Sequence, residues 1–136
     1  MITDKRNGFL IAASILLIAI GSAVGAAGVS LIRLDGTRQL GIAASDSTIL
    51  FVGSMAVVIA IALVLSGIIA LRRREFALVA GACSTVAFVV AGFVGNAMLF
   101  NSPRLLHTGA NAIVAILIDG LLWKGVSRGE ERTRPH

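Results

Sequence analysis

Charged residues are scarce in this sequence. Only 14% of its 136 residues are charged, whereas 57% are hydrophobic and the mean hydropathy is +0.93. A typical soluble domain carries about 25% charged residues, and a soluble domain of this length could not bury so much apolar surface. The composition therefore excludes an ordinary soluble enzyme, a disordered chain and a coiled coil. It predicts an integral membrane protein.

Residues that bind metals or form cross-links are also rare. Cys83 is the only cysteine, so the chain forms neither an intramolecular disulfide nor a cysteine-based metal cluster. The histidines are His107 and His136, too few for a pair of haem ligands within one bundle. The sequence lacks a Gly-rich phosphate loop and the motifs HExxH, CxxC and GxSxG. We therefore expect no metal, no other cofactor and no enzymatic activity.

The net charge of +5 comes from 12 Lys and Arg against 7 Asp and Glu. In a soluble protein such a balance would suggest nucleic acid. In a membrane protein it reflects basic residues that face the cytoplasm and anionic lipid headgroups. We expect the bilayer, including anionic headgroups, to be the partner, and we expect no nucleic-acid binding.

The positions of the charges divide the chain into four apolar stretches. A spanning helix needs roughly 20 apolar residues, and each stretch between charged clusters is long enough for one. The expected helices lie at about 8–32, 48–71, 76–100 and 105–123. They form the predicted fold, an all-α antiparallel bundle of four transmembrane helices. Residues 1–123 make one membrane domain, and 124–136 are expected to form a flexible cytoplasmic tail.

The distribution of basic residues predicts the orientation in the membrane. With four spans, nine of the 12 basic residues fall on one side, and only Arg33, Arg38 and Arg104 fall on the other. The positive-inside rule then places both termini in the cytoplasm of a plasma or inner membrane. The cluster Arg72, Arg73, Arg74 and, near the end of the fourth span, Lys124 are expected to contact lipid headgroups at this surface.

Small residues predict close helix packing, because lipid provides no hydrophobic drive for helices to associate. The first helix contains Gly21 and Gly25 in a GxxxG pattern, and the third contains Gly95. One interpretation is a homodimer through the first helix. The other, which we favour, is packing within a single bundle, since every helix carries small residues.

Polar side chains gather on one stripe of the fourth helix. A step of 100° per residue brings His107, Asn111 and Asp119 to the same side, and the opposite side is aliphatic. Asn96 of the third helix lies at about the depth of Asn111 if the two helices are antiparallel. These four residues form a candidate polar site within the membrane. The alternative is that the asparagines form an interhelical hydrogen bond, worth only about 0.6 kcal/mol.

Asp119 is the only acidic residue within a predicted span. A charge at the centre of a helix costs roughly 2.5–3.5 kcal/mol on insertion scales. An ion pair with Lys124 or one of Arg72–Arg74 would account for it, and so would a protonatable or cation-binding site. His107 and Asp119 lie about 18 Å apart along a helix, too far for one catalytic dyad.

Two functions are the main candidates, and a membrane enzyme is a less favoured third. The first is a small structural or accessory membrane protein that packs with itself or with a larger membrane assembly. The alternative is a small transporter or channel that uses the polar site on the third and fourth helices. An enzyme acting on lipid or quinone would need a richer polar cluster than this one.

Overall fold

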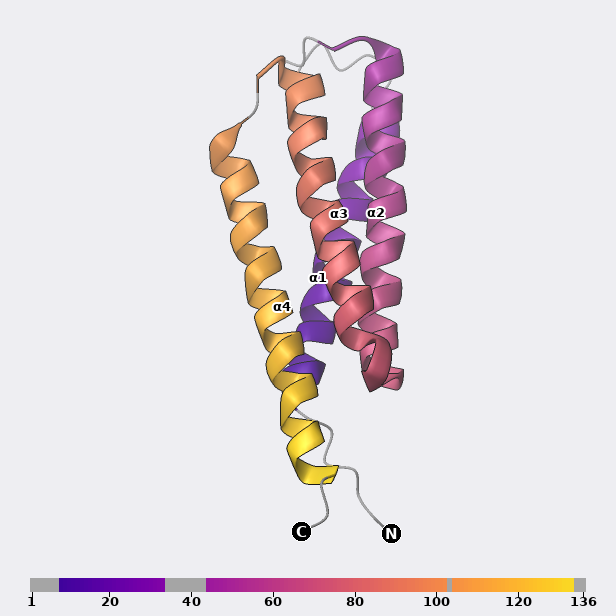
Figure 1. The fold of residues 1–136 in the computed structure, drawn as a ribbon. Helices are drawn as coiled ribbons and strands as arrows, with labels where there is room; N and C mark the ends of the chain where they lie inside the picture. The colour runs from indigo at the N-terminus through magenta and orange to yellow at the C-terminus, as the bar shows by residue number, and fades with distance from the viewer. Residues whose placement is uncertain (1–7, 34–43, 103, 134–136) are drawn as a thin grey trace.

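The computed structural model describes residues 8–33, 44–102 and 104–133, with side chains up to residue 127 (Figure 1). All the regular structure in these ranges is helical. The four helices are α1 (Gly8–Arg33), α2 (Asp46–Arg72), α3 (Arg74–Phe100) and α4 (Leu105–Thr133). Each is long and apolar enough to cross a membrane, which confirms the prediction of four membrane-length helices.

Local sequence explains where the helices begin and end. Ser45 caps the start of α2, where its hydroxyl accepts a hydrogen bond from the Thr48 N–H at 3.4 Å. Arg73 alone joins α2 to α3 in an extended conformation, and its N–H donates to the Ile69 carbonyl at 2.7 Å. Asn101 ends α3 with a φ of 56°, a left-handed conformation that asparagine tolerates better than most residues.

The fourth helix is longer than predicted. It continues to Thr133, whereas the sequence places its end at 123 and a flexible tail from 124 onward. The first proline after the span is Pro135, so no proline interrupts this stretch. Arg74 also holds this turn, because its guanidinium donates to the carbonyls of Gly125 and Val126 at 3.1 and 2.6 Å. Residues 134–136 lie outside the described part of the chain.

The helices form a ring of neighbours in which α1 packs on α2 and α4, and α3 packs on α2 and α4. Glycine allows the closest contact, between α1 and α2. A Cβ atom on Gly21 would lie 2.9 Å from the Ala60 carbonyl oxygen, and one on Gly28 would lie 2.8 Å from the Gly53 carbonyl oxygen. Later residues of α1 therefore contact earlier residues of α2.

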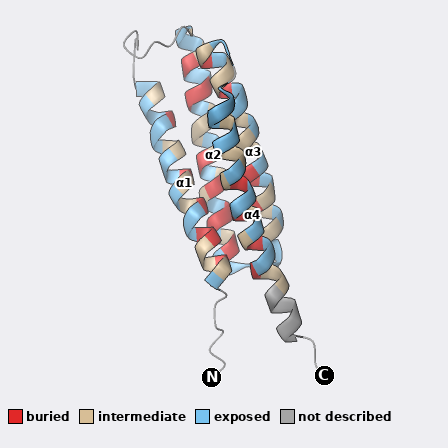
Figure 2. Cartoon of the chain, turned by 90° about the vertical axis from the view of Figure 1, so that its left-hand side faces the viewer, coloured by how far each residue is buried: buried red, intermediate tan, exposed pale blue. Residues whose placement is uncertain are grey.

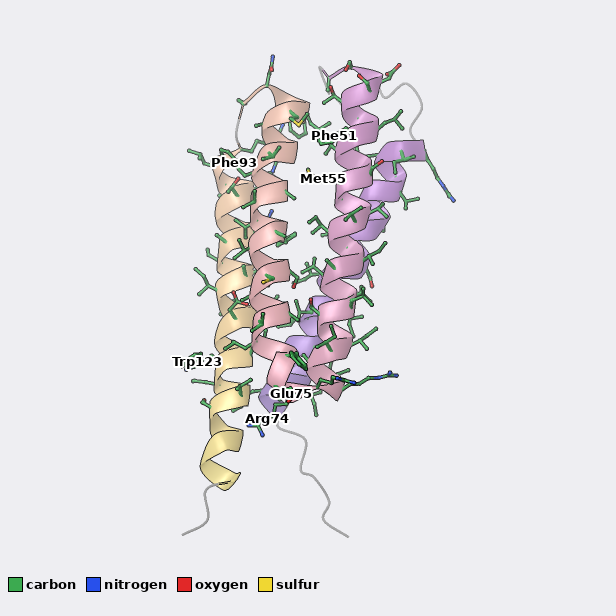
Figure 3. All side chains as sticks on the ribbon, turned by 45° about the vertical axis from the view of Figure 1, so that its right-hand side comes forward. Phe51, Met55, Arg74, Glu75, Phe93 and Trp123 are labelled. Carbon is green, nitrogen blue, oxygen red and sulfur yellow. The ribbon has the colours of Figure 1, made fainter. Side chains whose placement is uncertain are left out.

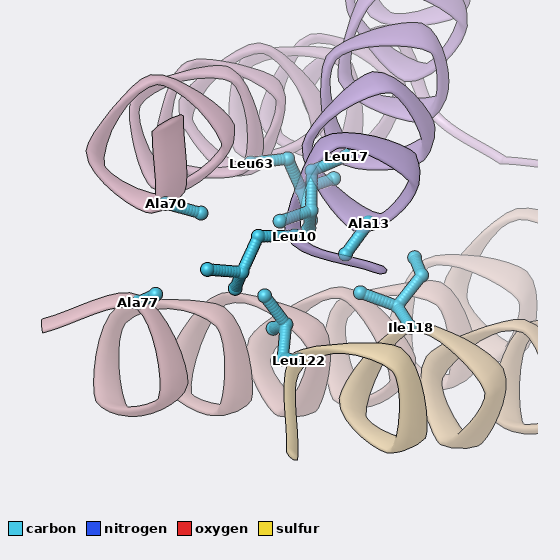
Figure 4. Packing of buried hydrophobic residues seen from close by; sticks show 8 residues of the cluster. All are labelled: Leu10, Ala13, Leu17, Leu63, Ala70, Ala77, Ile118 and Leu122. Atoms are coloured by element: carbon cyan, nitrogen blue, oxygen red, sulfur yellow. The ribbon is translucent and has the colours of Figure 1, made fainter. Parts of the chain in front are cut away.

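Two apolar clusters fill the bundle, one towards each end. Side chains from all four helices meet in the first, which consists of Leu10, Ala13, Leu17, Leu63, Ala70, Ala77, Ile118 and Leu122 (Figure 4). The second cluster consists of Ile49, Val52 and Leu99, from α2 and α3. Helix α4 takes part only in the first cluster. Towards the end of the bundle where α3 ends, α1 and α4 diverge (Figures 1 and 2).

Burial follows the pattern of a protein in lipid. The serine and threonine side chains at 14, 66, 84 and 85 are buried, whereas many large aliphatic side chains lie outside (Figure 2). Val58 is 64% exposed and Ile116 is 71% exposed. In water such a surface would be unfavourable, but in a bilayer it meets acyl chains.

Candidate functional site

Asp119 is held by Thr85, across the interface between α3 and α4. The Thr85 hydroxyl lies 3.1 and 3.0 Å from the two carboxylate oxygens of Asp119, and Thr85 itself is fully buried. The same hydroxyl also reaches the carbonyls of Gly81 and Ala82 within its own helix. It has a single proton, so the carboxylate and the backbone carbonyls compete for one donor.

Two of the basic residues proposed as partners of Asp119 have other contacts. Arg74 donates to the backbone of α4, and the Lys124 ammonium lies 6.0 Å from the centre of the Phe9 ring. Within the described residues Asp119 forms no salt bridge. The carboxylate is half-buried, and a hydroxyl is the group that contacts it.

The two asparagines of the predicted site face different surroundings. Asn96 lines a cavity between α1, α2 and α3. Asn111 packs against α3 at Gly92, where its Nδ2 atom would lie 2.6 Å from a Cβ added to that glycine. The described residues include no hydrogen bond between Asn96 and Asn111, although the two helices are neighbours.

His107 lies apart from the other three candidates. Its side chain is exposed, in the first turn of α4, and α4 leans away from α3 at this end (Figure 1). Arg104, just before this turn, places its guanidinium 4.0 Å from the centre of the Phe100 ring. The structure therefore does not bring His107 together with Asp119 or Asn96.

The basic cluster surrounds the link between α2 and α3. Arg72, Arg73 and Arg74 are all exposed, as is Lys124 at the same end of the bundle. Figure 3 shows Arg74 and Glu75 at this end, with Trp123 projecting outward from α4. An exposed aromatic ring beside exposed cations is the arrangement expected at a membrane–water interface.

The predicted packing glycines all lie at contacts between helices of this chain. Gly21 and Gly25 face Ala60 of α2. Gly95 of α3 faces α2 as well, where a Cβ would lie 3.2 Å from Val52 Cγ1. The GxxxG face of α1 is therefore covered by α2.

Thr85 is the contact residue that sequence reasoning did not find. Threonine is common in apolar helices, so its presence alone carries no signal. If α3 and α4 are antiparallel around a turn near residues 101–104, residues at similar depth have numbers that sum to about 206, as those of Asn96 and Asn111 do. This relation places Asp119 opposite a position within one helical turn of Thr85. Applied to every polar residue, that relation would have found the pair.

A cavity lies beside Asn96, between three of the helices. Its volume is about 240 Å³, and its walls come from α1, α2 and α3. They are almost entirely apolar, and Asn96 supplies the one amide among them. Asp119, His107 and Asn111 do not line it.

No family model, no curated protein and no solved structure matches this chain.

Proposed function

We propose that the chain is a small accessory membrane protein: an antiparallel four-helix bundle, without catalytic activity, that associates with a second membrane protein or with another copy of itself. The observation that carries this proposal is that its polar side chains connect neighbouring helices. Thr85 and Asp119 join α3 to α4, Ser66 joins α2 to α3 at 3.0 Å, and Arg74 joins α3 to α4. They stabilise helix contacts and do not converge on a shared polar cavity.

Two features support the antiparallel arrangement and the orientation. Later residues of α1 contact earlier residues of α2, and a single residue, Arg73, links α2 to α3. The exposed residues Arg72–Arg74 and Lys124 then share one end, and the positive-inside rule assigns this end to the cytoplasm of the cell membrane.

The exposed side of α4 is the surface we assign to the partner. This helix has the smallest buried share of the four spans, and it contributes no side chain to the second apolar cluster, at the end of the bundle that contains His107. Ile113, Ile116 and Leu117 form a continuous aliphatic face there. Helix association in membranes depends on such van der Waals packing.

Site-specific photocrosslinking in native membranes tests this assignment. A photoreactive amino acid at Ile116 is expected to give one discrete adduct, either with a second copy of the chain or with one membrane protein. The matched control is the same amino acid at Val58 on α2, which is similarly exposed. Equal labelling at both positions, together with a lone monomer in native mass spectrometry, would overturn the accessory role.

Transport is the second candidate, and it depends on Asp119. It is an acidic residue within a span, and it has no cationic partner among the described residues. Ion flux into proteoliposomes that Asp119→Asn abolishes and Asn96→Leu leaves intact would support this candidate. Flux that is absent, or unchanged in both Asp119→Asn and His107→Ala, would exclude it.

A further inference from the structure

The cavity beside Asn96 has a polar end and an apolar end. Asn96 and Leu99 lie within one turn of the end of α3, about 6 Å or less along the helix axis. Phe88 lies on the same wall, 11 residues before Leu99, a distance of about 16 Å at 1.5 Å per residue. The cavity therefore extends through about one leaflet, since the hydrocarbon core is about 30 Å thick.

The carboxamide of Asn96 has no hydrogen-bond partner among the described residues. This amide has two N–H donors and one acceptor oxygen in an otherwise apolar lining, and an unsatisfied amide in hydrocarbon is costly. A ligand that accepts a hydrogen bond at this end, and is apolar below it, would satisfy the amide and fill the cavity.

The cavity also has an identifiable mouth. Its lining residues are buried or half-buried except for Ala27 of α1, which is exposed. No lining residue comes from α4, and α1 and α4 diverge at this end of the bundle (Figures 1 and 2). Met55, another lining residue, lies between α2 and α3 (Figure 3). The opening therefore faces sideways, towards lipid.

We propose that this cavity binds one acyl chain of an ester-linked membrane lipid, with the Asn96 amide donating a hydrogen bond to the ester carbonyl. The volume of about 240 Å³ exceeds the ~150 Å³ that accommodates a benzene ring, so it takes a segment of a chain and leaves the headgroup outside. The amide lies near the membrane surface, at the level of a lipid ester, and the apolar walls lie deeper, at the level of the acyl chain.

Photolabelling with a defined lipid tests the proposal. The probe is a diacyl phosphatidylcholine with a diazirine midway along one acyl chain, incorporated with the full-length protein into phosphatidylcholine vesicles. Peptide mapping is expected to find label concentrated on Met55 and Phe88, in the walls of the cavity. Label spread evenly over lipid-facing residues such as Val58 and Val79 would overturn the proposal.

Two variants sharpen the experiment. Ala27→Leu at the mouth is expected to lower cavity labelling about tenfold, whereas Ala26→Leu adds the same volume to the neighbouring exposed residue and is expected to have no effect. Equal labelling in both variants contradicts the proposed entry route. If Ala27→Leu does not fold, the label map of the unaltered protein still decides the matter.

The role of Asn96 has its own readout. An ether-linked probe lacks the carbonyl, so the unaltered protein should label with the ester probe about threefold more than with the ether probe, the effect of one hydrogen bond in a membrane. Asn96→Leu should remove this preference and retain labelling by both probes. A preference that survives in Asn96→Leu would show that the amide does not contact the ester.

Discussion

Replacing Gly21 by alanine should destabilise the contact between α1 and α2. The added Cβ would lie 2.9 Å from the Ala60 carbonyl oxygen and 2.9 Å from Val64 Cγ2. A side-chain methyl can move, but the carbonyl belongs to the backbone of α2. The two helices must therefore separate locally, and the packing around Gly21 loosens.

The size of the effect follows from two opposing terms. Alanine is favoured over glycine in a helix by about 1 kcal/mol, whereas overpacking a well-packed site costs typically 1–3 kcal/mol. Because a backbone atom and a side chain are both too close, we take the upper part of that range. The expected loss in the free energy of unfolding is about 2 kcal/mol, roughly a thirtyfold change in the equilibrium constant.

Pulse proteolysis across a series of SDS mole fractions, in mixed micelles, measures this free energy. Gly109→Ala is the matched control, since a Cβ there meets nothing within 4 Å and Gly109 lies within α4. It is expected to stabilise the protein by up to about 1 kcal/mol through helix propensity alone.

Equal effects of Gly21→Ala and Gly109→Ala would refute the close contact between α1 and α2. A different failure is also informative. If Gly21→Ala left the free energy of unfolding unchanged but dissociated a dimer, the GxxxG face would serve association between chains. The homodimer interpretation of α1 would then replace packing within the bundle.

Three further experiments test the polar contacts. A double-mutant cycle of Thr85→Val and Asp119→Asn, measured by the same proteolysis assay, should give a coupling of about 0.6 kcal/mol and at most ~1.7 kcal/mol; additive effects would mean that the two side chains do not interact. Ser66→Ala should cost about 0.6 kcal/mol for its bond to α3, and an unchanged SDS midpoint would show that this bond contributes nothing. Arg74→Gln removes two charge-assisted bonds to the backbone of α4, so amide hydrogen exchange over residues 124–133 should accelerate severalfold, while Arg72→Gln should leave it unchanged; equal rates in the two variants would contradict the role of Arg74.

Much of the fold was predictable because charge is expensive in hydrocarbon. The expected start of the first helix and end of the third match α1 and α3, and the other boundaries of the first three helices differ by one or two residues. The end of α4 was not predictable in this way. Charged residues limit the span, but they do not end a helix, and α4 continues past Lys124 to Thr133.

The candidate site was only partly predictable. The stripe on α4 identified Asp119 as the residue to examine, and its depth would have pointed to Thr85, but the sequence alone could not rank Thr85 above the nearby cations as its partner. Depth relations placed Asn96 and Asn111 at one level. They could not show that the two side chains leave α3 and α4 in different directions, one into a cavity and one onto Gly92.

The sequence by itself determined that the chain belongs in a membrane and which segments have the length to cross it, because these follow from the transfer of charged and apolar groups and need no neighbours. The tertiary structure decided which faces meet. Gly21 and Gly25 pack on α2, Asp119 accepts a hydrogen bond from Thr85, and a cavity remains beside Asn96 where α1 and α4 diverge. These contacts depend on the rotation and tilt of each helix against its neighbours, and helices of similar apolar composition leave those angles to close packing.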